Sequence, residues 1–154
     1  MNTYAIARSI EIAAPLTRVH ALIADFRSWT RWSPWADLDA DQRREYSGPE
    51  SGEGAFYEWE GRGKVGGGNM MVASSTPAAI DIRLVLLRPW KVNCPMRFTV
   101  TSSEEGTRVS WTVDGERRGM QRLAAAVLHP ERSIADDMET GLQRLKAVAE
   151  SSER

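Results

Sequence analysis

The chain has 154 residues, one cysteine and a formal net charge of -1. Its 20 basic and 21 acidic side chains are balanced, which argues against nucleic-acid binding, because such proteins usually carry a basic stripe. No apolar run reaches the ~18 residues of a membrane helix, and the first residues lack the apolar core of a signal peptide. A lone Cys94 cannot form an internal disulfide, which fits a reducing compartment. We therefore expect one soluble, cytoplasmic domain over residues 1–154, with no integral membrane segment.

The first part of the chain predicts a strand followed by two short helices. Residues 4–12 alternate between apolar and polar side chains, as a strand does. Pro15 then opens a predicted helix over residues 15–26, whose apolar side chains recur at helical spacing. Trp29, Trp32 and Trp35 follow at intervals of three and predict a helical turn that runs into a loop. These rings either form an apolar lip for ligand entry or pin the loop onto the sheet, and the second interpretation is favoured.

The middle of the chain predicts an antiparallel meander. Apolar and polar side chains alternate within short segments, and turn residues separate the segments at intervals of about ten. Within this region Cys94 alternates with apolar neighbours, so we expect it to point inward as a small hydrophobe. The predicted strands cover residues 41–46, 54–61, 65–75, 79–89, 91–103 and 107–115.

One stretch of this meander, residues 57–72, has an unusual composition. Tyr57 and Trp59 share one face of a predicted strand, and Glu58 and Glu60 share the other. The aromatic pair is expected to face the interior, either as the wall of a cavity or as sealed core, while the glutamates face water. Three consecutive glycines at 66–68 then predict a bulge or a close approach of a neighbour.

The last part of the chain is helical in pattern. Residues 120–128 are prone to form a helix, and His129-Pro130 interrupts it, because the residue before proline avoids helical angles. Residues 131–152 predict the longest amphipathic helix, with acids in its first half and Arg144 and Lys146 near its end, as the helix dipole favours. Its apolar face is predicted to consist of Ile134, Met138, Leu142, Leu145 and Val148 or Ala149.

Several segments of the chain resemble one protein superfamily over nearly its whole length. They are "IEIAAPLTRVHALIADFRSWTRWSPW", "SGPESGEGAFYEWEGRGKVGGGNM", "GTRVSWTVDG" and "GLQRLKAVAE". These segments are similar to the START-like (SRPBCC) superfamily, which includes polyketide cyclase/dehydrase-like and birch-allergen-like proteins. The resemblance implies an α+β helix-grip fold: a curved antiparallel sheet of six to seven strands around a long C-terminal helix, with two short helices after strand 1.

The same resemblance implies an apolar pocket between the sheet and the C-terminal helix. Binding of a small hydrophobic molecule (lipid, polyketide or quinone-like) is the leading expectation, without a cofactor. A polyketide cyclase or aromatase using the same cavity is the alternative, and a surface-acting or chaperone-associated protein is the third hypothesis. Exposed strand edges would also allow a homodimer. The expected cavity wall consists of Phe26, Trp32, Tyr57, Trp59, Met70, Val72, Leu84, Met96, Phe98, Trp111, Leu123 and Met138.

No set of polar residues in the sequence forms a catalytic motif. His20 and His129 are the polar candidates, although a lone histidine is more often structural, and catalytic residues stay unassigned. Two isolated histidines and one distant cysteine do not form a metal motif, so no metal is expected. Arg83 and Arg97 fall on polar strand faces and are expected in solvent. The arginines within residues 117–122 would lie near a lid and could contact a ligand.

Overall fold

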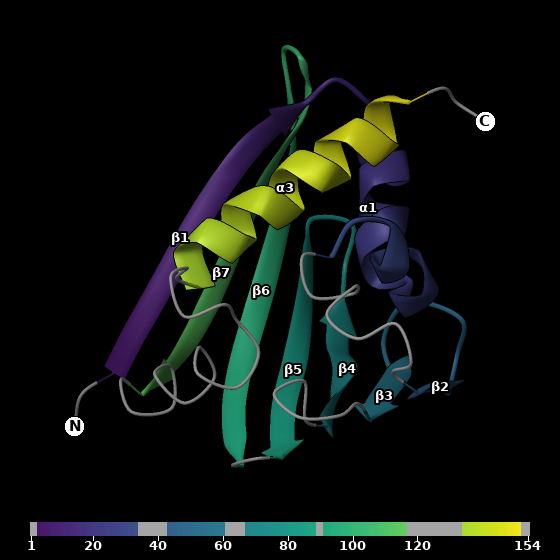
Figure 1. Ribbon diagram of the computed structural model, residues 1–154. Helices are drawn as coiled ribbons and strands as arrows, with labels where there is room; N and C mark the ends of the chain where they lie inside the picture. The colour runs from purple at the N-terminus through teal and green to yellow at the C-terminus, as the bar shows by residue number, and fades with distance from the viewer. Residues whose placement is uncertain (1–2, 34–42, 61–66, 89–90, 117–133, 152–154) are drawn as a thin grey trace.

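The computed structural model describes residues 3–33, 43–60, 67–88, 91–116 and 134–151 (Figure 1). It contains seven strands, an N-terminal α-helix, a 3-10 helix and a long C-terminal α-helix in these described parts. The elements are β1 (Thr3–Ile12), α1 (Leu16–Ala24), η1 (Phe26–Arg31), β2 (Arg43–Ser47), β3 (Phe56–Glu60), β4 (Gly67–Ser75), β5 (Ala79–Arg88), β6 (Val92–Ser103), β7 (Gly106–Glu116) and α3 (Ile134–Glu150).

The seven strands form one antiparallel sheet in the order β1-β7-β6-β5-β4-β3-β2. Strands β2 to β7 pair in chain order as a meander. The last strand, β7, then pairs with β1, the first strand of the chain. The sheet curves, and Figure 1 shows α3 running diagonally across β1, β7 and β6 with α1 beside its C-terminal end. Among the described elements, α3 contacts β1, α1 and η1. The predicted α+β helix-grip fold is therefore confirmed, including the two short helices after the first strand.

The core lies on the inner face of the sheet, where the predicted alternation holds. Along β5 the residues Ile80, Ile82, Leu84 and Leu86 are buried, because a strand sends successive side chains to opposite faces. The antiparallel register places buried residues of the neighbouring strand opposite those of β5. Cys94, for example, lies opposite Leu84 and is buried, as the sequence predicts.

Trp29 and Trp32 hold the first helical segment together. The Nε1 of Trp29 donates to the backbone oxygen of Ile23 at 2.8 Å, and that of Trp32 donates to the oxygen of Leu22 at 3.0 Å. Buried indole N–H groups need such partners. The rings therefore fasten η1 to α1. Both also meet Trp111 of the sheet, with ring centroids 6.4 and 6.0 Å away, which supports the pinning interpretation. Trp35 lies outside the described residues. Pro15 is the residue before the helix rather than part of its first turn.

The long helix α3 buries the predicted apolar face. Met138, Leu142, Leu145 and Ala149 are all buried, and Ala149 rather than Val148 completes the stripe. No basic residue lies in the last turn of the helix. Lys146 lies just before that turn, as predicted, and pairs with Glu150 at 2.6 Å, while Arg18 of α1 supplies a cation at the last carbonyls.

Candidate functional site

Three half-buried aromatic side chains form a strip on the inner face of β2 and β3. Tyr46 lies opposite Tyr57 in the register of the two strands, and Trp59 follows two residues later on the same face. Ring centroids of Tyr46 and Tyr57 lie 5.1 Å apart at 29°, and those of Tyr57 and Trp59 lie 5.9 Å apart at 22°. Phe26 of η1 connects this aromatic strip to the core, with its ring centroid 6.1 Å from that of Tyr57. The strip is thus continuous with the core and still partly open to solvent.

The glycine run explains how Trp59 fits against the next strand. Gly68 pairs with Trp59, and the β4–β5 register shifts between Gly67 and Gly68. A Cβ on Gly68 would lie 2.8 Å from the Cη2 atom of Trp59, and it would also collide with the backbone oxygen of Val85. Only glycine leaves room for this approach. The bulge and the close approach predicted from the sequence are both confirmed.

Two arginines accompany the aromatic strip. The guanidinium carbon of Arg27 lies 4.6 Å from the ring centroid of Tyr46, a cation–π geometry. Arg44 forms a side-chain hydrogen bond with Tyr57. Burial raises the pKa of the Tyr57 hydroxyl, and the charge and hydrogen bond of Arg44 oppose that rise. Burial likewise raises the pKa of Tyr46, against the charges of Arg44 and Arg27. Both phenols are therefore neutral near pH 7, and each can donate a hydrogen bond.

Arg27, Arg44 and Tyr46 were missed by the sequence analysis. Alternation within residues 43–47 places Arg44 and Tyr46 on one strand face, and this was the signal that could have found them. The signal is weak because only one of the two side chains is apolar. Nothing in the sequence indicates the contact between Arg27 and Tyr46, since it depends on how η1 meets β2.

Most of the expected cavity wall is buried in the structure. Tyr57 and Trp59 are half-buried, and Leu123 lies outside the described residues. Phe98 and Trp111 stack with centroids 4.8 Å apart, and Trp32 meets both at 6.0 Å. An open space beside these side chains stays a prediction. The buried members are Phe26, Trp32, Met70, Val72, Leu84, Met96, Phe98, Trp111 and Met138.

The sequence matches one family model over nearly its whole length. Residues 4–150 match a family described as "Polyketide cyclase / dehydrase and lipid transport". The chain belongs to this family. None of the curated proteins matches the chain significantly.

Solved structures support the fold of this family member. Protein MLL2253 from Mesorhizobium loti has a TM-score of 0.70 at 12% identity, covering 98% of this chain and 100% of that one. The di-domain ARO/CYC StfQ from the steffimycin biosynthetic pathway has a TM-score of 0.68 at 12% identity, covering 97% and 52%. DynU16, a putative protein in the dynemicin biosynthetic locus, has a TM-score of 0.65 at 17% identity, covering 96% and 47%. At these identities the likeness extends to the fold alone.

The polar candidates of this family member lie apart from the aromatic strip or have structural contacts. The Nε2 of His20 lies 2.8 Å from the backbone oxygen of Thr76, in the turn between β4 and β5, and His129 lies outside the described residues. Arg83 and Arg97 are exposed, as predicted, and Arg97 forms two hydrogen bonds with Asp81 at 2.7 and 3.0 Å. The arginines within residues 117–122 lie outside the described residues.

Metal and thiol chemistry find no support in the described part of the chain. No group of three or more His, Cys, Asp or Glu side chains is placed to hold a metal ion there. Burial raises the pKa of the Cys94 thiol to about 11, so the reactive thiolate is scarce at neutral pH. Among the described helices, none is long and apolar enough to cross a membrane.

Asp137 is a buried acid that the sequence analysis grouped with the acids of the first half of the helix. Asp137 is only 1% exposed and lies next to buried Met138 in the first turns of α3. Seven residues later, and so on the same side of the helix, Arg144 donates to the backbone oxygen of Ser33 at 3.3 Å. Asp137 therefore lies on the side of α3 that turns towards the segment after η1. Gly141, between the two along this side, is also buried.

Proposed function

We propose that this protein binds a small hydrophobic molecule, of lipid, polyketide or quinone-like class, on the inner face of the sheet with the aromatic strip as one wall. The description of its family names both polyketide chemistry and lipid transport. The observation that carries the proposal is the half-burial of Tyr46, Tyr57 and Trp59 beside a fully buried core. Binding pockets are typically apolar and aromatic with a few polar groups. Stacked rings that are only partly buried offer such a surface to a flat or extended ligand.

A cyclase or aromatase is the second candidate, and the contact between Arg44 and Tyr57 favours it. A guanidinium can only donate, so Arg44 gives a hydrogen bond to the phenolic oxygen of Tyr57. The O–H of Tyr57 then remains available to a carbonyl oxygen of a ligand. A donor placed beside a carbonyl stabilises the enolate that forms when a water molecule takes a proton from the adjacent carbon. The pair thus supplies the inward ionisable group that an enzyme of this kind requires.

Two tryptophan substitutions separate a binding wall from sealed core. Trp111 is fully buried, so Trp111→Ala should cost ~3–5 kcal/mol of unfolding free energy. Trp59 is half-buried, so Trp59→Ala should cost roughly half as much. If Trp59 contacts the ligand, its loss should also weaken binding about tenfold or more under conditions where the variant is folded. Urea unfolding measures the first effect, and titration calorimetry with menadione, oleate and naringenin measures the second.

Arg83→Ala is the matched control, because Arg83 is exposed on the opposite face of the sheet. It should leave both stability and binding unchanged. Saturable binding of at least one compound that Trp59→Ala weakens and Arg83→Ala does not would support the proposal. Equal stability losses for the two tryptophan variants, with no binding by the native protein, would refute it and favour a surface-acting protein. Tyr57→Phe then tests the enzyme, since it should preserve binding while abolishing any turnover of an enolisable 1,3-diketone.

A further inference from the structure

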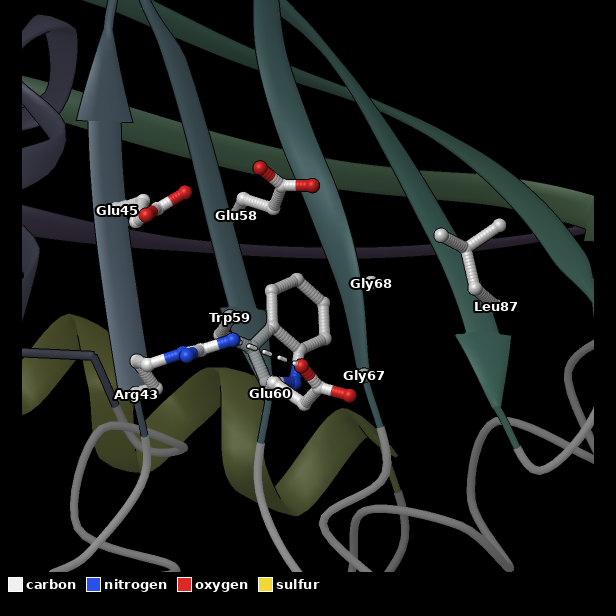
Figure 2. A pocket seen from close by; sticks show the side chains of 8 residues that line it. All are labelled: Arg43, Glu45, Glu58, Trp59, Glu60, Gly67, Gly68 and Leu87. Atoms are coloured by element: carbon white, nitrogen blue, oxygen red, sulfur yellow. Dashed lines mark hydrogen bonds and ion pairs between the residues drawn. The ribbon is translucent and has the colours of Figure 1, made fainter.

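A hollow lies on the outer face of the sheet, behind the aromatic strip. It measures about 270 Å³ and is formed by the ends of β2 to β5 (Figure 2). We call it the outer cup. Glu45 and Glu58 pair across β2 and β3 and are both exposed, on the face opposite Tyr46 and Tyr57. The acidic wall of the outer cup thus lies on the face opposite the proposed ligand wall, and Trp59 is shared by the two.

The floor of the outer cup includes an aromatic ring that belongs to the inner face. Trp59 lines the hollow together with Gly67 and Gly68. Figure 2 shows its six-membered ring between β3 and β4, beside the positions of the two glycines. Since neither glycine has a side chain, neither covers the ring from outside. The glycines that let Trp59 fit therefore also expose it to the outer cup.

The walls of the outer cup are acidic on one side and aliphatic on the other. Glu45 lies directly opposite Glu58, an arrangement in which like charges oppose folding. Glu60 adds a third carboxylate, and its oxygen lies 3.4 Å from a nitrogen of Arg43. Leu87 forms the other wall and is 47% exposed, which is unusual for a large aliphatic side chain in the described part of the chain. A positively charged guest would relieve the repulsion between the glutamates.

We propose that the outer cup binds a small organic cation, with an alkylammonium group against the Trp59 ring and the carboxylates of Glu45 and Glu58 around it. Indole is the aromatic ring that attracts such cations most strongly. Leu87 contacts the alkyl part of the guest, and the volume suits a headgroup of a few heavy atoms. A hard metal ion is disfavoured, because it requires six or more oxygen ligands and the floor and one wall here are apolar.

Choline and its neutral isostere 3,3-dimethyl-1-butanol provide a direct test. Titration of ¹⁵N-labelled protein to ~20 mM choline should shift the Trp59 indole signal saturably, as expected of a weak, millimolar site. The neutral alcohol should leave that signal in place, and added salt should weaken the response to choline. Trp59→Phe assigns the signal. A peptide carrying trimethyllysine presents the same headgroup, and the tighter of the two binders identifies whether the source is a free metabolite or a protein side chain.

Glu45 and Glu58 are exposed, so their side chains can be replaced without disturbing the core. Glu45→Gln and Glu58→Gln should each weaken choline binding about threefold or more, while the folded spectrum stays intact. Glu53→Gln, an exposed acid outside the outer cup, should have no effect. The proposal is overturned if choline and the alcohol shift the Trp59 signal equally, if neither shifts it, or if the Glu45→Gln/Glu58→Gln double variant binds as the native protein does.

Discussion

The clamp that Arg18 forms on the end of α3 yields a sharp prediction. Its Nε donates to the backbone oxygen of Ala149 at 2.7 Å, and its Nη2 lies 3.1 Å from the oxygen of Ser151 and 3.4 Å from that of Val148. These carbonyls belong to the end of a helix that has no basic residue in its last turn. The guanidinium therefore donates to carbonyls at the helix end and places a positive charge at the negative end of the helix dipole.

Replacement of Arg18 by Met should destabilise the protein by about 2–3 kcal/mol. A hydrogen bond from a charged donor is worth ~1.5–3 kcal/mol. Of the three contacts, one is short, one is ordinary and one is long, and the side chain is half exposed, so the sum falls well below three full bonds. Met keeps the aliphatic stem of the side chain, so the loss isolates the guanidinium. For a domain of this size the melting temperature should fall by roughly 5–10 °C.

Urea unfolding followed by circular dichroism measures this loss as a lower midpoint with an unchanged slope. Arg18→Lys should lie between Arg18→Met and the native protein, because one ammonium cannot reach three carbonyls in a fork. Arg83→Met is the matched control and should change the unfolding free energy by less than ~0.5 kcal/mol. If Arg18→Met unfolds at the same urea concentration as Arg83→Met, the clamp does not stabilise α3 and the reasoning is wrong.

Two further predictions concern the glycine run and the thiol. Gly68→Ala should cost about 1–3 kcal/mol by overpacking, because its Cβ meets the Val85 oxygen and the Trp59 ring; a melting temperature equal to that of the native protein would contradict this. The pKa of Cys94 is raised from 9.0 to about 11, so above pH 9 the unfolded thiol ionises while the folded one keeps its proton. The unfolding free energy should therefore fall as pH rises from 9 to about 11, and Cys94→Val should remove that part of the dependence. Urea midpoints across this range measure it.

The sequence predicts the fold well wherever one side of an element is buried. The period of two along β5 and the helical period along α3 both follow from burial of a single face. The register of β5 with β6 follows as well, because it brings the buried side chains of the two strands onto the same face. Contacts between distant segments leave no periodic signal. Arg18 reaches Ala149 across 131 positions of the chain, and Arg27 meets Tyr46 only because η1 packs beside β2. Such contacts are a property of the packed fold rather than of any local pattern.

The exposed strand edges, which led us to expect a homodimer, carry features that oppose pairing with another chain. β1 and β2 are the two edges of the sheet. Arg8 donates its Nη1 to the backbone oxygen of Ala7, and Glu150 accepts the N–H of Ala13 just after β1. β2 is only five residues long and exposes Arg43 and Glu45. Short, charged or side-chain-bonded edges hinder strand addition. A homodimer stays a prediction, and a route through edge strands would have to displace these contacts.

The tryptophans that the structure describes differ in how their rings are held. Trp29 and Trp32 are buried, and their N–H groups bond to backbone oxygens of α1, so their rings are fixed by the fold itself. Trp59 is half-buried, is stacked on a tyrosine that Arg44 contacts, and adjoins a glycine that removes cover from its outer side. A large ring left partly open gives up burial that would stabilise the fold. The two proposed binding surfaces, one on each face of the sheet, would give this lost burial a physical reason.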